Sequence, residues 1–194
     1  MKDKIECFFN AIKQKHIELY SESGLQHELA IFLRNNYQDL TVRLEYPTSR
    51  IYNPLPEFIK REIDIYVTVQ SGNEYKKYAI ELKMPKKDSG VPNEMYSTIE
   101  DVKFLEQLKQ NHFDGCYAIL ITNHQAFWDA KRANSGIYQL FNSYQVNIQS
   151  IDLSQLPDFL HHNGQIALLR NYKSVWNNYT DTHLTNWKCY LLEL

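Results

Sequence analysis

The sequence predicts an α/β protein with a central mixed β-sheet flanked by helices. Two N-terminal segments, residues 3–20 and 21–37, carry apolar side chains at helical spacing. Between residues 40 and 84, three segments alternate apolar and polar side chains as strands do. A continuous apolar run at residues 116–123 is typical of a fully buried central strand. Helices, a three-strand meander, a helix and a buried strand in this order favour a mixed sheet.

The two N-terminal helices are predicted from their apolar stripes. The first stripe consists of Ile5, Phe8, Phe9, Ile12, His16 and Leu19, and the second of Leu25, Leu29, Phe32 and Leu33. These positions recur every three or four residues, which places them on one face of a helix. Ser23 and Gln26 have the spacing of a capping box, so the second helix is expected to begin near them.

Three strands are predicted at residues 40–46, 61–69 and 76–84. A loop with three prolines separates the first two, and the last two are joined at Gly72 and Asn73, which are favourable turn residues. Strand alternation then predicts that Ile63 and Ile65 share one face of the sheet.

The second half of the chain is predicted to contain a third helix, two further segments with helical patterns and a final strand. A third helix is expected at residues 97–112, with Ser97 and Glu100 as its capping box. Residues 125–141 and 165–176 also have helical patterns, and residues 186–194 fit a closing strand.

Composition favours one soluble globular domain over residues 1–194. Of the residues, 43% are hydrophobic and 13% aromatic, which is enough for a substantial core. No apolar run is long enough to cross a membrane and the N-terminus has no signal-peptide pattern, so we expect no membrane association. Three cysteines without a paired motif favour a reducing cytoplasm. The net charge of −2 provides no overall basic field for nucleic acid, although a local patch can suffice.

Charged residues interrupt two of the predicted strands. Asp64, Glu81 and Lys83 fall on faces of adjacent strands that can meet if the register allows. Two carboxylates a few ångströms apart repel each other unless a cation lies between them, and oxygen ligands suit Mg²⁺ or Mn²⁺. Such a metal beside a lysine can hydrolyse phosphodiesters. Glu28, on or beside the apolar stripe of the second helix, is a candidate for a further ligand.

This pattern resembles the PD-(D/E)xK nuclease superfamily, which has the restriction-endonuclease-like fold. The resemblance covers residues 21–123, which would form the catalytic core, although Ile63 stands where the family name has proline. It implies that Asp64 and Glu81 are metal ligands, that Lys83 is the catalytic lysine, and that Glu28 is an additional ligand. The implied function is a Mg²⁺-dependent DNA endonuclease, most economically a stand-alone restriction enzyme that acts as a homodimer.

Basic residues near these positions are candidates for contacts with the DNA backbone. They are Lys60, Arg61, Lys86 and Lys87. The residues from Tyr138 onward would supply base recognition or dimer contacts.

Three alternatives stay open. The chain can be a repair, recombination or mobile-element nuclease of the same fold, or an inactive nuclease-fold module that binds DNA or a protein. The polar face bearing Asp64, Glu81 and Lys83 can also be simply the solvated side of an antiparallel sheet.

Overall fold

The computed structural model confirms the α/β class with a mixed sheet flanked by helices. It describes residues 1–14, 19–86, 90–128, 136–141, 145–179 and 187–194. Six strands form the main sheet in the order β1-β2-β3-β4-β8-β7. They are β1 (Leu40–Pro47), β2 (Glu62–Ser71), β3 (Glu74–Lys83), β4 (Gly115–Thr122), β8 (Trp187–Glu193) and β7 (Asn177–Tyr179). Only the β3–β4 pair is parallel among these strands, because the helix between them carries the chain back.

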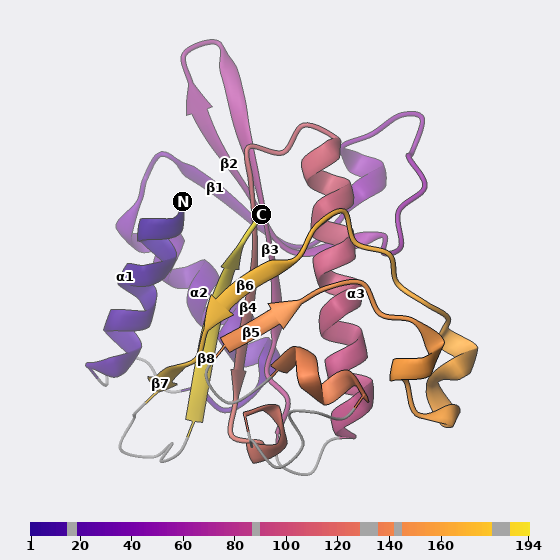
Figure 1. The fold of residues 1–194 in the computed structure, drawn as a ribbon. Coiled ribbons are helices and arrows are strands. Elements are labelled where there is room, and N and C mark those ends of the chain that lie inside the picture. The colour runs from indigo at the N-terminus through magenta and orange to yellow at the C-terminus, as the bar shows by residue number, and fades with distance from the viewer. Residues whose placement is uncertain (15–18, 87–89, 129–135, 142–144, 180–186) are drawn as a thin grey trace.

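Three helices cover the two faces of the sheet (Figure 1). Helices α1 (Lys2–Lys13) and α2 (Glu22–Asn36) lie on one face, and α3 (Val91–Gln110) lies on the other. A small sheet of β5 (Gln145–Ile148) and β6 (Tyr172–Val175) lies on the side of α3. None of the helices in the described part of the chain is long and apolar enough to span a membrane.

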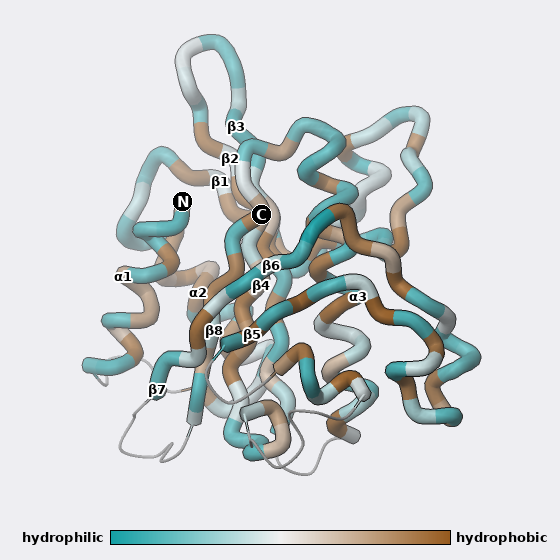
Figure 2. The backbone as a smooth tube through the Cα atoms, viewed as in Figure 1, coloured by the Kyte–Doolittle hydropathy of each residue, from teal (hydrophilic) through white to brown (hydrophobic). Residues whose placement is uncertain are grey.

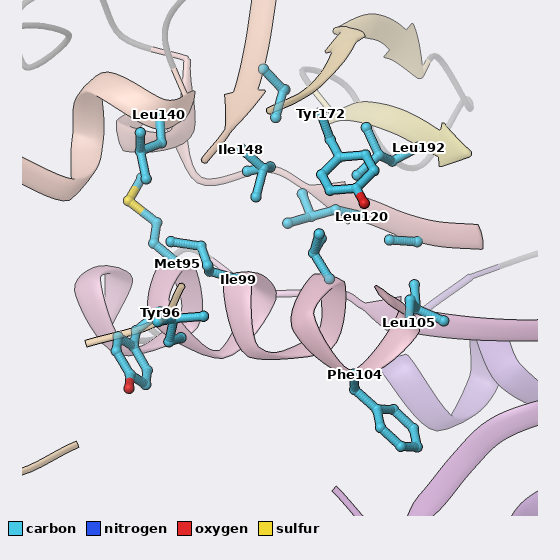
Figure 3. Close-up of a cluster of buried hydrophobic side chains, with 14 of the residues drawn as sticks. Met95, Tyr96, Ile99, Phe104, Leu105, Leu120, Leu140, Ile148, Tyr172 and Leu192 are labelled. Carbon is cyan, nitrogen blue, oxygen red and sulfur yellow. The ribbon is translucent and has the colours of Figure 1, made fainter. Parts of the chain in front are cut away.

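Each face of the sheet has its own hydrophobic core. On one face, α1 and α2 bury Phe8 and Leu29 against Ile65, Ile80 and other strand residues. On the opposite face, α3 packs on β4, β8 and the β5–β6 sheet. Figure 3 shows Ile99 and Leu105 of α3 directed at Leu120, whereas Phe104 points away from that group. Every residue of β4 is buried, as predicted for the central strand. The tube in Figure 2 is correspondingly apolar along β4 and hydrophilic at the outer loops.

Both predicted capping boxes are wrong, because other residues begin the helices. Ser21 caps α2 by accepting a hydrogen bond from Gly24 N at 2.9 Å. Helix α3 begins six residues before Ser97, at Val91, where Pro92 suits the first helical turn. Ser97 and Glu100 therefore lie inside the helix. His16, assigned to the first apolar stripe, lies outside the described residues.

The C-terminal third differs from the prediction in two segments. The described parts of residues 125–141 form two short 3₁₀ helices, Gln125–Phe127 and Gly136–Phe141, instead of one α-helix. Residues 165–176 contain a β-bridge at Ile166 and strand β6, because Ile166 and Tyr172 bury against the α3 core as extended chain. The predicted closing strand is confirmed as β8.

Candidate active site

The site lies where side chains of the β1–β2–β3 meander stop alternating regularly between the two faces of the sheet. Glu45 of β1 has a φ of +47°, a left-handed conformation that is uncommon outside glycine. Opposite this point, Ile65 packs in the α1–α2 core but Ile63 packs in the α3 core. The prediction that these two isoleucines share one face is therefore wrong. Asp64 lies between the two isoleucines, at the point where the alternation of β2 breaks.

The Asp64 and Glu81 side chains link the two strands beyond their regular pairing. Backbone pairing between β2 and β3 runs as far as Ile65 and Ile80. Past it, Asp64 Oδ2 accepts a hydrogen bond from Leu82 N at 2.8 Å, and Glu81 Oε1 accepts one from Asp64 N at 3.2 Å. Both predicted ligands thus come together by crosswise contacts. Each carboxylate is held by the backbone of the other strand, which fixes its orientation.

A third carboxylate and two lysines complete the cluster. Asp101, on α3, is only 3% exposed. The Lys60 ammonium contacts Glu81 Oε2 and lies 2.7 Å from Asp101 Oδ1. Lys83 Nζ lies 3.3 Å from Asp101 Oδ2, which nevertheless lacks a well-directed hydrogen bond. The predicted catalytic lysine therefore joins the acidic residues through Asp101.

Burial and neighbouring charges both shift the pKa values of these groups. Burial raises the pKa of Asp64 to about 6, although Lys60 and the Leu82 amide oppose this. The pKa of Glu81 is also raised, by burial and by the neighbouring carboxylates of Asp64 and Asp101. Burial would lower the pKa of Lys83, but Asp101 and Glu22 hold it above the ordinary value. Lys83 is therefore protonated at neutral pH.

Burial and neighbouring charges have opposite effects on the pKa of Lys60. Burial disfavours its ammonium form, but Glu81 and Asp101 raise its pKa above that of an ordinary lysine. Three carboxylates thus face two ammonium groups, and a fourth carboxylate, Glu22 Oε1, lies 3.8 Å from Lys83 Nζ. A site with this imbalance attracts a further cation.

A cavity of about 310 Å³ opens next to Asp64. It is lined by Glu22, Ser23, Gln26, Glu45, Asp64 and Leu82. The Gln26 side chain, which lines this cavity, donates hydrogen bonds to Glu45 Oε1 at 2.5 Å and to the Asp64 carbonyl at 2.8 Å. Three of the lining side chains are carboxylates, so the cavity repels a phosphodiester unless cations are present.

The acidic cluster supplies oxygen donors of the type that the predicted divalent metal requires. Carboxylate oxygens are the ligands that Mg²⁺ and Mn²⁺ prefer. In the described ranges, no three Asp, Glu, His or Cys side chains are arranged to enclose an ion as they stand. Lys60 contacts the Glu81 oxygen that a metal would need. The oxygen donors therefore fit Mg²⁺ or Mn²⁺ in chemistry, whereas in the present arrangement the Lys60 ammonium is in contact with Glu81.

Among the other predicted site residues, Glu28 does not line the cavity next to Asp64. Glu28 is half-buried on α2, two residues after Gln26. Two helical steps turn it by about 200° from Gln26, away from the cavity that Gln26 lines. Arg61 and Lys86 are exposed, at the start of β2 and after β3. Lys87 lies outside the described residues.

Sequence reasoning missed Asp101 and Glu22, and did not predict that Lys60 contacts the acidic cluster. Met84 N donates to Glu22 Oε2 at 2.8 Å, so Glu22 is the α2 carboxylate that reaches the site. Asp101 lies within the predicted third helix, beside buried residues such as Val102 and Ile99. Lys60 is predicted to contact DNA as one of several basic residues near the site, and its loop has no periodic pattern that would indicate the direction of the side chain.

Comparisons with known proteins leave the family of this chain open. No family model, no curated protein and no solved structure matches it.

A pH dependence of stability follows from the raised pKa of Asp64. Its folded pKa of about 6 exceeds the usual 3.8, so the protonated form favours folding and ionisation costs stability as pH rises between these values. In metal-free buffer, the unfolding free energy of the wild type relative to Asp64→Asn should fall by up to about 3 kcal/mol from about pH 4 to pH 7. Urea titrations at each pH measure this difference. A difference that rises with pH would contradict the proposed burial of Asp64.

Proposed function

We propose that this protein is a metal-dependent endonuclease of restriction-endonuclease-like fold that hydrolyses phosphodiester bonds in DNA. The observation that supports this most is the crosswise contact of Asp64 and Glu81, two carboxylates on adjacent strands, with Lys83 two residues further along. A solvated sheet face gives no reason for burying Glu81 to 1% exposure beside two other carboxylates. A cation site does.

In this proposal, each residue has a distinct role. Asp64 and Glu81 would hold Mg²⁺ or Mn²⁺, and when bound there the metal lowers the pKa of a water molecule and neutralises phosphate charge. Lys83, kept protonated by Asp101 and Glu22, donates hydrogen bonds that orient the attacking water and stabilise developing negative charge. Because its pKa is raised, Lys83 does not act as the general base. Asp101 acts through Lys83, because its carboxylate lies 3.3 Å from the Lys83 ammonium and holds it in place.

The substrate assignment rests on the charges around the site. Arg61, just before β2, and Lys86, just after β3, are exposed and would contact the DNA backbone. A homodimer of the chain would present two such centres to a duplex and cut both strands as a stand-alone restriction enzyme. The three cysteines Cys7, Cys116 and Cys189 are free thiols, which suits a cytoplasmic protein.

Incubation of the purified protein with supercoiled plasmid and phage DNA tests this proposal. With Mg²⁺ or Mn²⁺ we expect linear product, and discrete phage fragments would identify a restriction enzyme. Smearing or nicking would instead indicate a nuclease directed at DNA structure. Intact DNA with both metals, at high protein concentration and without EDTA, would contradict the nuclease assignment and favour a binding module.

A further inference from the structure

We propose that Lys60 is an internal counter-ion that occupies the place of a cation between Glu81 and Asp101, and that divalent metal binding displaces it. This inference rests on the proposed function, because it concerns the same acidic cluster. It assigns to Lys60 control over how tightly the metal binds.

The contacts of Lys60 are those of a bound cation. Its ammonium contacts carboxylates from two different elements, Glu81 of β3 and Asp101 of α3, and its side chain is 29% exposed. The Glu81 side chain is fully buried, so without Lys60 it would lack a compensating charge in the metal-free protein. Lys60 therefore stabilises the cluster when no metal is bound.

The loop that carries Lys60 is fixed, so only the side chain has to move. Ile59 N donates to Gln107 Oε1 of α3 at 2.9 Å. Phe58 packs edge-on against Phe104, with ring centroids 5.9 Å apart. The Lys60 ammonium lies 5.7 Å from the centroid of the same Phe104 ring. A long flexible lysine on a fixed backbone can leave Glu81 by side-chain rotation alone.

Lys60 and a divalent ion would compete for the same buried oxygen. The Lys60 ammonium is in contact with Glu81 Oε2, the oxygen of Glu81 that does not accept the Asp64 backbone hydrogen bond. Two cations at this one oxygen would repel each other at short distance. A divalent ion therefore binds Glu81 in exchange for Lys60.

Manganese titration of Lys60→Gln tests this exchange. Removing the competing ammonium should tighten the Mn²⁺ dissociation constant by about tenfold or more relative to the wild type. Without metal, the thermal midpoint of Lys60→Gln should fall by at least about 5 °C, and saturating Mn²⁺ should restore it. Arg61→Gln, which removes the same charge from the exposed neighbour, serves as the matched control and should change both values much less.

The outcomes separate this inference from the proposed function. A wild type that cleaves DNA while Lys60→Gln binds Mn²⁺ no more tightly than Arg61→Gln would overturn the inference alone. Absence of Mn²⁺ binding in the wild type and in both variants would overturn the inference together with the metal-dependent nuclease. An unchanged thermal midpoint in metal-free Lys60→Gln would show that Lys60 does not balance the buried carboxylates, and would also overturn the inference.

Discussion

Replacing Asp64 with asparagine should lower the rate of plasmid cleavage by at least about 10³-fold. Asparagine keeps the shape of the side chain, and its amide oxygen can still accept the hydrogen bond from Leu82 N. It loses the negative charge that a divalent ion requires as a ligand. The initial rate at which supercoiled plasmid is converted to nicked and linear forms, at saturating Mg²⁺, measures the effect.

Asp39→Asn is the matched control for this loss. Asp39 is exposed and precedes β1, so the same chemical change there should leave cleavage within about twofold of the wild type. Circular dichroism and urea unfolding should show that Asp64→Asn is folded at pH 7. A folded Asp64→Asn protein that cleaves at the wild-type rate would exclude Asp64 from the catalytic centre.

Phe104→Ala should cause the largest loss of stability, about 3–5 kcal/mol. The Phe104 ring is fully buried on α3 and packs edge-on against Phe58 of the loop that carries Lys60. Its removal leaves a cavity between the helix and that loop, which cannot collapse easily because Tyr52 also packs on Phe58. Urea denaturation followed by fluorescence and circular dichroism measures the free energy of unfolding.

Tyr75→Ala provides the comparison for this loss of an aromatic ring. Tyr75 is 63% exposed near the end of the β2–β3 hairpin, so its removal should cost less than about 1 kcal/mol. Equal losses for the two variants would contradict the packing of the Lys60 loop on α3.

The regular parts of the fold were predictable because their patterns are periodic. The β1–β2–β3 meander follows from alternating side chains and the turn at Gly72, whose φ of +64° suits glycine. Strand β4 follows from its continuous apolar run. After residue 124, 3₁₀ helices and a short strand lie where α-helices were predicted. Segments that bury one residue in three or four can have the same apolar spacing as an α-helix without forming one.

The candidate site was predictable only in part. Asp64, Glu81 and Lys83 stood out because charge is unusual in an apolar strand. Asp101 gave no comparable signal, because a carboxylate on an amphipathic helix is ordinarily on the solvent face. The left-handed conformation of Glu45, beside the point where the strands lose their alternation, is a backbone feature that no side-chain pattern specifies.

Titration calorimetry with Mg²⁺ and Mn²⁺ tests most directly whether Asp64 and Glu81 together bind a divalent ion. The wild type should bind one ion for each chain, and both Asp64→Ala and Glu81→Gln should abolish that binding while remaining folded. Binding that persists unchanged in either folded variant, or a wild type that binds neither metal, would contradict the proposed metal centre.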